Sequence, residues 1–261
     1  MLNIEQSRST KQATRSLAVS FARSPDEIEE ALRLRYQVFA EEQGARLPSA
    51  ALGIDQDEFD PHCKHLIARN TTTGEVVGTY RVLSPERARH LGRYYSDSEF
   101  DLGRLAHLRS RMVEVGRSCV HPDYRTGGTI ALLWSGLAQH VMEQGHEFLI
   151  GCASIGLADG GVQAAHIYNE LRDSALSPPE YRVFPRCALP LDPEKLALTR
   201  GVRVSMPPLL KGYMRLGAYV CGDPAWDPDF NTADLLLLLP VSNISARYAN
   251  HFMKPLEAAA A

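Results

Sequence analysis

The chain has 261 residues and a mass of 28.9 kDa, a length that allows one large domain or two small ones. Hydrophobic residues make up 44% and charged residues 23%, which argues against a disordered chain, and five scattered cysteines without a CxxC pair argue against a disulfide scaffold or a zinc ribbon. The formal net charge of −3 argues against bulk nucleic-acid binding, which usually needs a basic surplus.

The first half of the chain predicts a tail, a helix and a hairpin. Residues 1–18 are polar, contain no signal-peptide core and are expected to form a flexible tail. Ser24 is placed as the N-cap of a helix, with a proline directly after it and Glu27 closing a capping box. Strand-like runs over 65–68 and 76–82 follow an acidic loop and predict a hairpin.

The second half alternates strands and helices. Its predicted elements are a helix with loops over 84–110, a strand over 113–120, a helix opening at Gly127-Gly128, a strand over 148–155, a helix over 162–171, a strand over 181–189, a helix over 209–216, an extended segment over 217–221 and a buried strand over 232–239. This mixture predicts an α+β fold of three layers, α/β/α, in which helices flank a mixed sheet. We expect a single domain over 19–250 and a C-terminal tail over 251–261.

A glycine-rich turn between the strand over 113–120 and the following helix is a candidate phosphate cradle. It consists of Arg125, Thr126, Gly127 and Gly128, and backbone N–H groups at a helix start favour an anion. Glycine lets the backbone approach a phosphate closely, and Arg125 adds a positive charge. An ordinary strand-to-helix turn that uses glycine for its geometry is the alternative interpretation.

The segment Arg125-x-x-Gly128-x-Ile130 resembles the Arg/Gln-x-x-Gly-x-Gly/Ala signature of GCN5-related N-acyltransferases. In that family the loop holds the pyrophosphate of coenzyme A, and the fold is a mixed sheet flanked by helices. Ile130 stands where the family has a small residue. The phosphopantetheine of a carrier protein has one phosphate, so it would need fewer contacts from this loop than the pyrophosphate of coenzyme A.

Two further resemblances cover more of the chain. The runs Arg35-Tyr-Gln-Val-Phe39, Asp57-Glu-Phe-Asp60, Gly78-Thr-Tyr-Arg81 and Glu114-Val-Gly-Arg117 occur in an order similar to that of acyl-homoserine-lactone synthases, which use acyl-acyl carrier protein on a related fold. The C-terminal third is similar to L-ornithine N(α)-acyltransferases of bacterial ornithine-lipid synthesis, often labelled hemolysin-like, in the runs Pro208-Leu-Leu-Lys-Gly-Tyr213, Leu216-Gly-Ala218 and Gly222-Asp-Pro-Ala-Trp-Asp-Pro-Asp-Phe230. This last resemblance extends over roughly residues 25–240.

Glu114 lies inside an otherwise apolar predicted strand, where a carboxylate is costly unless it is paired or used. With the resemblance, it becomes the candidate base that accepts a proton, through water, from the attacking amine, because only a neutral amine attacks a thioester. A structural ion pair with Arg81 or Arg117 is the alternative. In a regular strand Glu114 and Arg117 face opposite sides, so a catalytic pair needs a bulge near Gly116, which the resemblance implies.

The candidates for binding the amino-acid substrate are Arg35, Phe39, Asp57, Asp60 and Arg81. The arginines could form bidentate ion pairs with a carboxylate, and the aspartates could hold the arginines in place or bind the side-chain ammonium of ornithine. A purely structural arginine–aspartate network, with Phe39 in the core, is the alternative. The 23 arginines against 5 lysines fit either a need for planar guanidinium groups or a GC-rich genome.

Two other clusters are interpreted without a catalytic role. His62, Cys63 and His65 beside Asp60 lack the spacing of a metal site, so no metal is expected. Cys119 has no His–carboxylate partner in the sequence, and direct acyl transfer needs no covalent step. We therefore interpret Cys119 as a buried bystander.

Residues 195–222 carry five basic residues and no acidic one, with apolar side chains between the charges. Such a stretch could dock an acidic carrier protein or an anionic membrane surface, and a solvated basic face is the alternative. No apolar run approaches the roughly 18 residues that a membrane span needs. We expect a cytoplasmic protein whose contact with the inner membrane, where it exists, is peripheral.

The resemblances together imply an N-acyltransferase that moves a 3-hydroxyacyl chain from acyl carrier protein to the α-amino group of L-ornithine and so forms lyso-ornithine lipid. No cofactor is expected to stay bound, because the phosphopantetheine thioester of the carrier protein is the donor. Two alternatives stay open: an enzyme of the same fold that acylates glycine, another amino acid or a signal precursor, and a non-catalytic protein that binds acyl carrier protein. Membrane lysis is disfavoured because no long amphipathic segment is visible.

Overall fold

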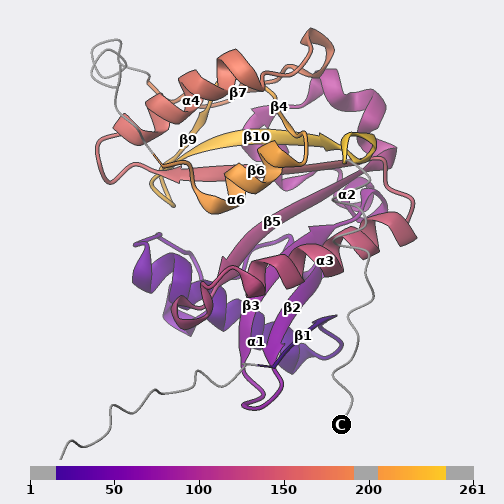
Figure 1. Cartoon of the computed structure of the whole chain (residues 1–261), viewed down its shortest axis with the longest axis vertical. Helices are drawn as coiled ribbons and strands as arrows, with labels where there is room; N and C mark the ends of the chain where they lie inside the picture. The colour runs from indigo at the N-terminus through magenta and orange to yellow at the C-terminus, as the bar shows by residue number, and fades with distance from the viewer. Residues whose placement is uncertain (1–15, 191–204, 245–261) are drawn as a thin grey trace, which may run out of the picture.

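The computed structural model describes residues 16–190 and 205–244 (Figure 1). At its centre is a mixed sheet of eight strands in the order β1-β2-β3-β5-β6-β10-β8, with β9 beside β10. The strands are β1 (Leu17–Phe21), β2 (Lys64–Asn70), β3 (Val76–Leu83), β5 (Met112–Val120), β6 (Phe148–Gly156), β8 (Tyr219–Val220), β9 (Ala225–Asp227) and β10 (Thr232–Pro240). A separate two-stranded ribbon pairs β4 (Phe100–Asp101) with β7 (Phe184–Pro185).

Helices cover both faces of the sheet, as the sequence predicts. They are α1 (Pro25–Tyr36), α2 (Pro85–Leu91), α3 (Gly128–Glu143), α4 (Val162–Ser174) and α6 (Pro208–Arg215). Side chains alternate across the sheet along β2: Leu66 packs in the same core as Leu133 of α3, whereas its neighbour Ile67 packs with Ala31 of α1. Helices α1 and α3 therefore lie on opposite faces, which confirms the three-layer α/β/α prediction.

The start of α1 follows from its first residues. The Ser24 hydroxyl accepts a hydrogen bond from the backbone N–H of Glu27 at 3.2 Å, and Pro25 occupies the first helical position. The Glu27 carboxylate does not complete the expected box on Ser24, because it accepts instead from the backbone N–H of Arg23 at 2.7 Å. Beyond Tyr36 the helix widens into a π-helical turn over Gln37–Glu42.

Two boundaries differ from the sequence prediction. Leu17 and Ala18 belong to β1, paired with Arg69 and Asn70 of β2, so the expected tail is too long by at least two residues. The strand expected over 181–189 is reduced to Phe184–Pro185, because neighbouring backbone N–H groups of that segment bond to carbonyls of three separate segments and form no continuous ladder. The tail expected over 251–261 lies outside the described residues.

The middle of the sheet separates after three rungs. Strands β5 and β6 run parallel and pair from Met112↔Phe148 to Glu114↔Ile150, and no pairing follows. Beyond that point β5 continues beside β3, and β6 continues beside β10 (Figure 1). The divergence leaves a gap between two half-sheets and places Glu114 at its apex.

Within the described ranges, every helix is too short or too polar to cross a lipid bilayer.

Candidate active site

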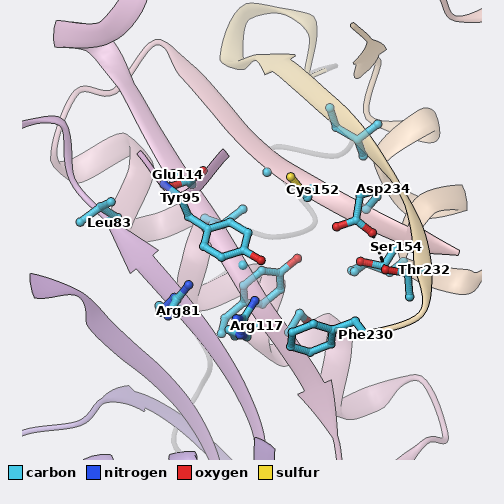
Figure 2. A pocket seen from close by; sticks show the side chains of 18 of the residues that line it. Arg81, Leu83, Tyr95, Glu114, Arg117, Cys152, Ser154, Phe230, Thr232 and Asp234 are labelled. Atoms are coloured by element: carbon cyan, nitrogen blue, oxygen red, sulfur yellow. Dashed lines mark hydrogen bonds between the residues drawn. The ribbon is translucent and has the colours of Figure 1, made fainter. Parts of the chain in front are cut away.

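A cavity of about 220 Å³ opens where β5 leaves β6 (Figure 2). Strand β5 contributes Glu114 and Arg117 to its wall, and the opposite wall carries Cys152 of β6 and Asp234 of β10. Aromatic rings line it as well: Phe39, Phe59, Tyr80, Tyr95, Tyr213 and Phe230. The cavity therefore joins charged groups to an apolar lining, a combination typical of ligand sites.

Glu114 is buried at the apex of the divergence, with 5% of its surface exposed. Its carboxylate accepts hydrogen bonds from the backbone N–H of Tyr95 at 2.6 Å, the backbone N–H of Ser96 at 2.8 Å and the Ser96 hydroxyl at 2.5 Å. Burial raises the pKa of Glu114, and these donors oppose the rise only in part. Among the described residues it forms no ion pair with Arg81 or Arg117, so the structural alternative for Glu114 does not apply in the expected form.

A bulge in β5 brings Arg117 to the same cavity. The pairing with β3 moves from Gly116↔Arg81 to Cys119↔Thr79, so β5 holds one residue more than β3 between these rungs. Arg117 has a φ of 49°, in the left-handed region that L-residues rarely adopt. The bulge expected near Gly116 is therefore confirmed, and Glu114 and Arg117 both line the cavity.

The guanidinium of Arg117 is held between two rings. Its central carbon lies 4.9 Å from the centroid of the Tyr95 ring and 4.7 Å from that of Phe230. Such cation–π contacts fix a cation in a partly dry site. Arg117 thus presents a positive charge in a fixed position.

Four of the five predicted substrate-binding residues join Arg117 and Asp55 in what we call the arginine–aspartate network: Arg35, Arg81, Arg117, Asp55, Asp57 and Asp60. Arg35 contacts Asp55 at 2.8 Å and Asp60 at 2.6 Å. Arg81 contacts Asp57 at 2.6 Å and Asp60 at 3.2 Å. Arg117 reaches Asp55 at 3.2 Å, a residue outside the predicted substrate-binding set.

The structure divides the predicted substrate-binding residues into those that line the cavity and those that do not. Phe39 and Arg81 line the cavity, whereas Arg35, Asp57 and Asp60 do not, and Arg35 is completely buried. Burial raises the pKa of Asp60, but the Arg35 and Arg81 guanidinium groups outweigh it and hold that pKa well below its usual range. The geometry favours the structural interpretation for Arg35 and Asp60, which position Arg81 and Arg117 from behind.

The candidate phosphate cradle lies at the start of α3. Gly127 precedes the helix with a φ of 90°, a conformation that glycine adopts without strain. Arg125 forms a two-pronged ion pair with Glu42, both contacts being 2.6 Å, and its Nε donates to the Val120 carbonyl at 3.0 Å. Thr126 and both glycines are exposed, so the backbone at this helix start is accessible.

An acidic pair in the cavity region was missed by the sequence analysis. The carboxylates of Glu99 and Asp234 and the thiol of Cys152, which we call the acidic trio, have one ligand atom each within 4.8 Å of one another. Asp234 interrupts the apolar strand β10 as Glu114 interrupts β5, a signal that could have found it. Glu99 follows a short 3-10 turn and has no sequence signal.

The remaining predictions concern cysteines and basic residues. Burial raises the pKa of Cys119 to about 12, so its thiol stays protonated and a nucleophilic role is not supported. In the His62–His65 cluster, the carboxylate of Asp60 is occupied by arginines. Lys211 and Arg215 are exposed on α6, and the other basic residues of the 195–222 stretch lie outside the described residues.

Comparisons with known proteins agree on the kind of domain. Residues 34–135 match the family described as acetyltransferase (GNAT) domain. An N-acyl amino acid synthase from uncultured soil microbes has a similar solved structure, with a TM-score of 0.55 and 14% identity over 88% of this chain and 93% of that one. At this identity the likeness concerns the fold alone.

Curated relatives match nearly the whole chain. A protein of Agrobacterium fabrum, named L-ornithine N(alpha)-acyltransferase, is 39% identical over 91% of this chain and 85% of its own length. A protein of Rhodobacter capsulatus with the same name is 36% identical over 93% of this chain and 96% of its own length.

Proposed function

The chain belongs to the L-ornithine N(α)-acyltransferase family and is an acyltransferase, and from this premise we propose that it transfers a 3-hydroxyacyl chain from acyl carrier protein to the α-amino group of L-ornithine. The product is lyso-ornithine lipid, and the reaction is the first step of ornithine-lipid synthesis. One observation carries the proposal: the buried carboxylate of Glu114 lines a cavity at the divergence of β5 and β6.

Glu114 takes the proton that the amine releases, directly or through one water. Its raised pKa suits a base near neutral pH. The Ser96 hydroxyl, at 2.5 Å, can either donate to the carboxylate or accept from the carboxylic acid. The contact can therefore persist when Glu114 becomes protonated.

The amine nitrogen attacks the thioester carbonyl carbon, and the carbon–sulfur bond then breaks. Negative charge develops on the carbonyl oxygen, and backbone N–H groups at the β5 bulge, between Gly116 and Cys119, are placed to stabilise it. The pantetheine thiol leaves with the proton that the amine gave up. Arg117 and Arg81 hold the substrate carboxylate at the cavity wall.

The donor's phosphate binds at the start of α3. Gly127 and Gly128 expose backbone N–H groups there, and Arg125 lies beside them. The exposed Lys211 and Arg215 of α6 supply positive charge for an acidic carrier protein. Catalysis then takes place in the cytoplasm, and the lipid product accounts for peripheral contact with the inner membrane.

An apolar groove beside the cavity accommodates the acyl chain. It has a volume of about 230 Å³ and shares Leu149 and Tyr213 with the cavity. Trp134 and Leu137 of α3 and Leu239 of β10 also line it. An apolar groove of this size suits a long acyl chain and gives acetyl donors no advantage.

The reaction is tested by incubating the enzyme with 3-hydroxypalmitoyl carrier protein and a panel of amino acids that includes ornithine, lysine and glycine. Mass spectrometry should find the acyl group on ornithine. Acylation of glycine alone would replace ornithine as the acceptor, and binding of the carrier protein without any product would overturn the enzyme assignment. The same panel with 3-hydroxypalmitoyl coenzyme A tests the donor.

The groove is tested by the variant Ala138→Trp, because Ala138 lines it and a larger side chain would fill it. We expect a greater loss of kcat/KM with 3-hydroxypalmitoyl than with 3-hydroxybutyryl carrier protein. Equal losses with both donors would place the acyl chain elsewhere.

A further inference from the structure

The acidic trio contains two carboxylates that lack a cation. Among the described residues neither Glu99 nor Asp234 takes part in an ion pair, whereas Asp55, Asp57 and Asp60 each contact an arginine. Both carboxylate oxygens of Glu99 are buried without a hydrogen bond of regular geometry, and the Tyr95 hydroxyl and the Asp234 carboxylate are its polar neighbours. Asp234 is 3% exposed and receives the Thr232 hydroxyl at 2.8 Å. Buried charges without a partner are strongly unfavourable, so the site calls for a cation or a proton.

A shared proton satisfies the pair while no ligand is bound. Burial and the neighbouring Asp234 raise the pKa of Glu99 to about 9, and burial also raises the pKa of Asp234. The titratable groups that face Glu99 are Tyr95, Cys152, Asp227 and Asp234. None of them supplies a permanent positive charge.

The trio is connected to Glu114 through short contacts. The Ser96 hydroxyl lies 2.5 Å from the Glu114 carboxylate and 3.5 Å from the Cys152 sulfur, and Cys152 belongs to the trio. Asp234 and Cys152 line the same cavity as Glu114 (Figure 2). The two amines of an extended ornithine are separated by about 6 Å along five covalent bonds, a span that suits one amine near Glu114 and the other near the acidic pair.

We propose that Glu99 and Asp234 bind the side-chain ammonium of the amino-acid acceptor and thereby select a diamino acid and direct acylation to its α-amine. The inference rests on the proposed function, because it assumes that Glu114 receives the proton of the amine that reacts. A primary ammonium is a compact charge with three donors, which matches two carboxylates better than a planar guanidinium does. Held there, the side-chain amine stays protonated and does not attack the thioester.

The choice of amine is the informative consequence. In free ornithine the side-chain amine is the more basic of the two, so near neutral pH the α-amine has the larger neutral fraction, and a site that holds the side-chain amine as its cation strengthens this preference. A site that keeps the side-chain amine charged, beside a base that deprotonates the other, accounts for the selection by position.

The test compares the wild-type enzyme with Glu99→Gln and Asp234→Asn on two acceptors, ornithine and norleucine. Norleucine has the length of ornithine with a methyl in place of the ammonium. We expect each variant to raise the KM for ornithine about 10- to 100-fold, the range for a hydrogen bond to a charged group, and to leave kcat/KM for norleucine unchanged or higher. The fraction of product acylated on the side-chain amine should also rise, which a purely structural role would not cause.

The control is Glu75→Gln, an exposed glutamate on the turn between β2 and β3 that does not line the cavity. It should leave both acceptors and the product ratio unchanged. If the wild-type enzyme acylates ornithine and the two variants keep its KM and its product ratio, the ammonium site is wrong and the proposed function stands. If the wild-type enzyme acylates neither acceptor, both proposals fail.

A measurement on the wild-type enzyme covers the case in which the variants do not fold. Because a proton and the ammonium compete for the pair, the ratio of kcat/KM for ornithine to that for norleucine should rise from about pH 7 to about 9. A flat ratio would overturn the proposal. Loss of norleucine turnover on chelation, restored by zinc, would assign the trio to a metal instead.

Discussion

The arginine–aspartate network and the acidic trio, two groups of buried charges next to the cavity, differ in how their carboxylates are neutralised. In the arginine–aspartate network, Asp55, Asp57 and Asp60 each contact at least one guanidinium within 3.2 Å. In the acidic trio, among the described residues, Glu99 and Asp234 have no ion pair at all. Burial alone therefore does not mark a carboxylate as a binding group: a carboxylate that pairs with guanidinium groups supports the fold, whereas one without a cation is available to a cationic ligand.

Glu114 stands between these regions, and its loss should have the largest effect. The variant Glu114→Gln keeps the size of the side chain and one acceptor oxygen for the Ser96 donors, but its amide nitrogen cannot accept from the Tyr95 N–H and the side chain cannot take a proton. We expect kcat to fall about 100- to 10,000-fold with little change in the KM for the acyl donor. Steady-state kinetics with a melting curve as control would measure this. An undiminished kcat would remove Glu114 from the mechanism.

Removing one member of the arginine–aspartate network should lower the stability of the fold. The variant Arg35→Met leaves Asp55 and Asp60 as buried carboxylates without their principal partner, so we expect the free energy of unfolding to fall by about 3–5 kcal/mol. Arg33→Met, on the same helix, breaks an exposed pair with Glu29 and should cost less than about 1 kcal/mol. Equal losses in denaturant titrations would contradict the distinction.

The arginine–aspartate network should lose stability in acid, and the acidic trio should lose stability in alkali. The folded-state pKa of Asp60 is lowered, so its stabilisation is present above the unfolded pKa of 3.8 and is lost as the pH falls below it. The folded-state pKa of Glu99 is raised from 4.5 to about 9, so the folded state binds the proton more tightly and loses stability as the pH rises through that window. Glu99→Gln should therefore raise Tm at alkaline pH and leave it nearly unchanged in acid; a wild-type Tm profile that the variant reproduces would contradict this.

The smallest effect on stability is expected at the exposed Arg125–Glu42 pair, which belongs to neither the network nor the trio. Glu42→Gln should change the unfolding free energy by less than about 1 kcal/mol, because both side chains are more than one-third exposed. Freed from Glu42, Arg125 should lower the KM for the carrier-protein donor a few-fold, and Arg125→Ala should raise it. If neither variant moves the donor KM, the phosphate binds elsewhere.

Sequence patterns located the elements whose signals are local. The Ser24–Pro25 start of α1, the hairpin of β2 and β3, and the glycines before α3 were each predicted from adjacent residues. The prediction of a strand over 181–189 is wrong because a strand forms only where a partner strand pairs with it. The backbone hydrogen bonds of that segment go to several partners.

The site shows the same limit. Glu114 was found because a carboxylate in an apolar strand is costly, and the same argument applied to Asp234 would have found it. Glu99 could not be found, because 135 positions separate it from Asp234 in the sequence and only the folded chain brings the end of the Tyr95–Ser98 turn beside β10. Arg35 was assigned to the substrate because a sequence shows that an arginine is present, but not which carboxylates surround it.

The short turn at Tyr95–Ser98 has a consequence for how this family could diverge. Its first two backbone N–H groups hold Glu114, and Glu99 follows directly at its end. The length of the turn therefore sets the distance between Glu114 and the acidic pair. One inserted residue lengthens a chain by up to about 3.8 Å, comparable to a few methylene groups, so a change of acceptor length could arise from an insertion or deletion in this turn while every residue lining the cavity stays the same.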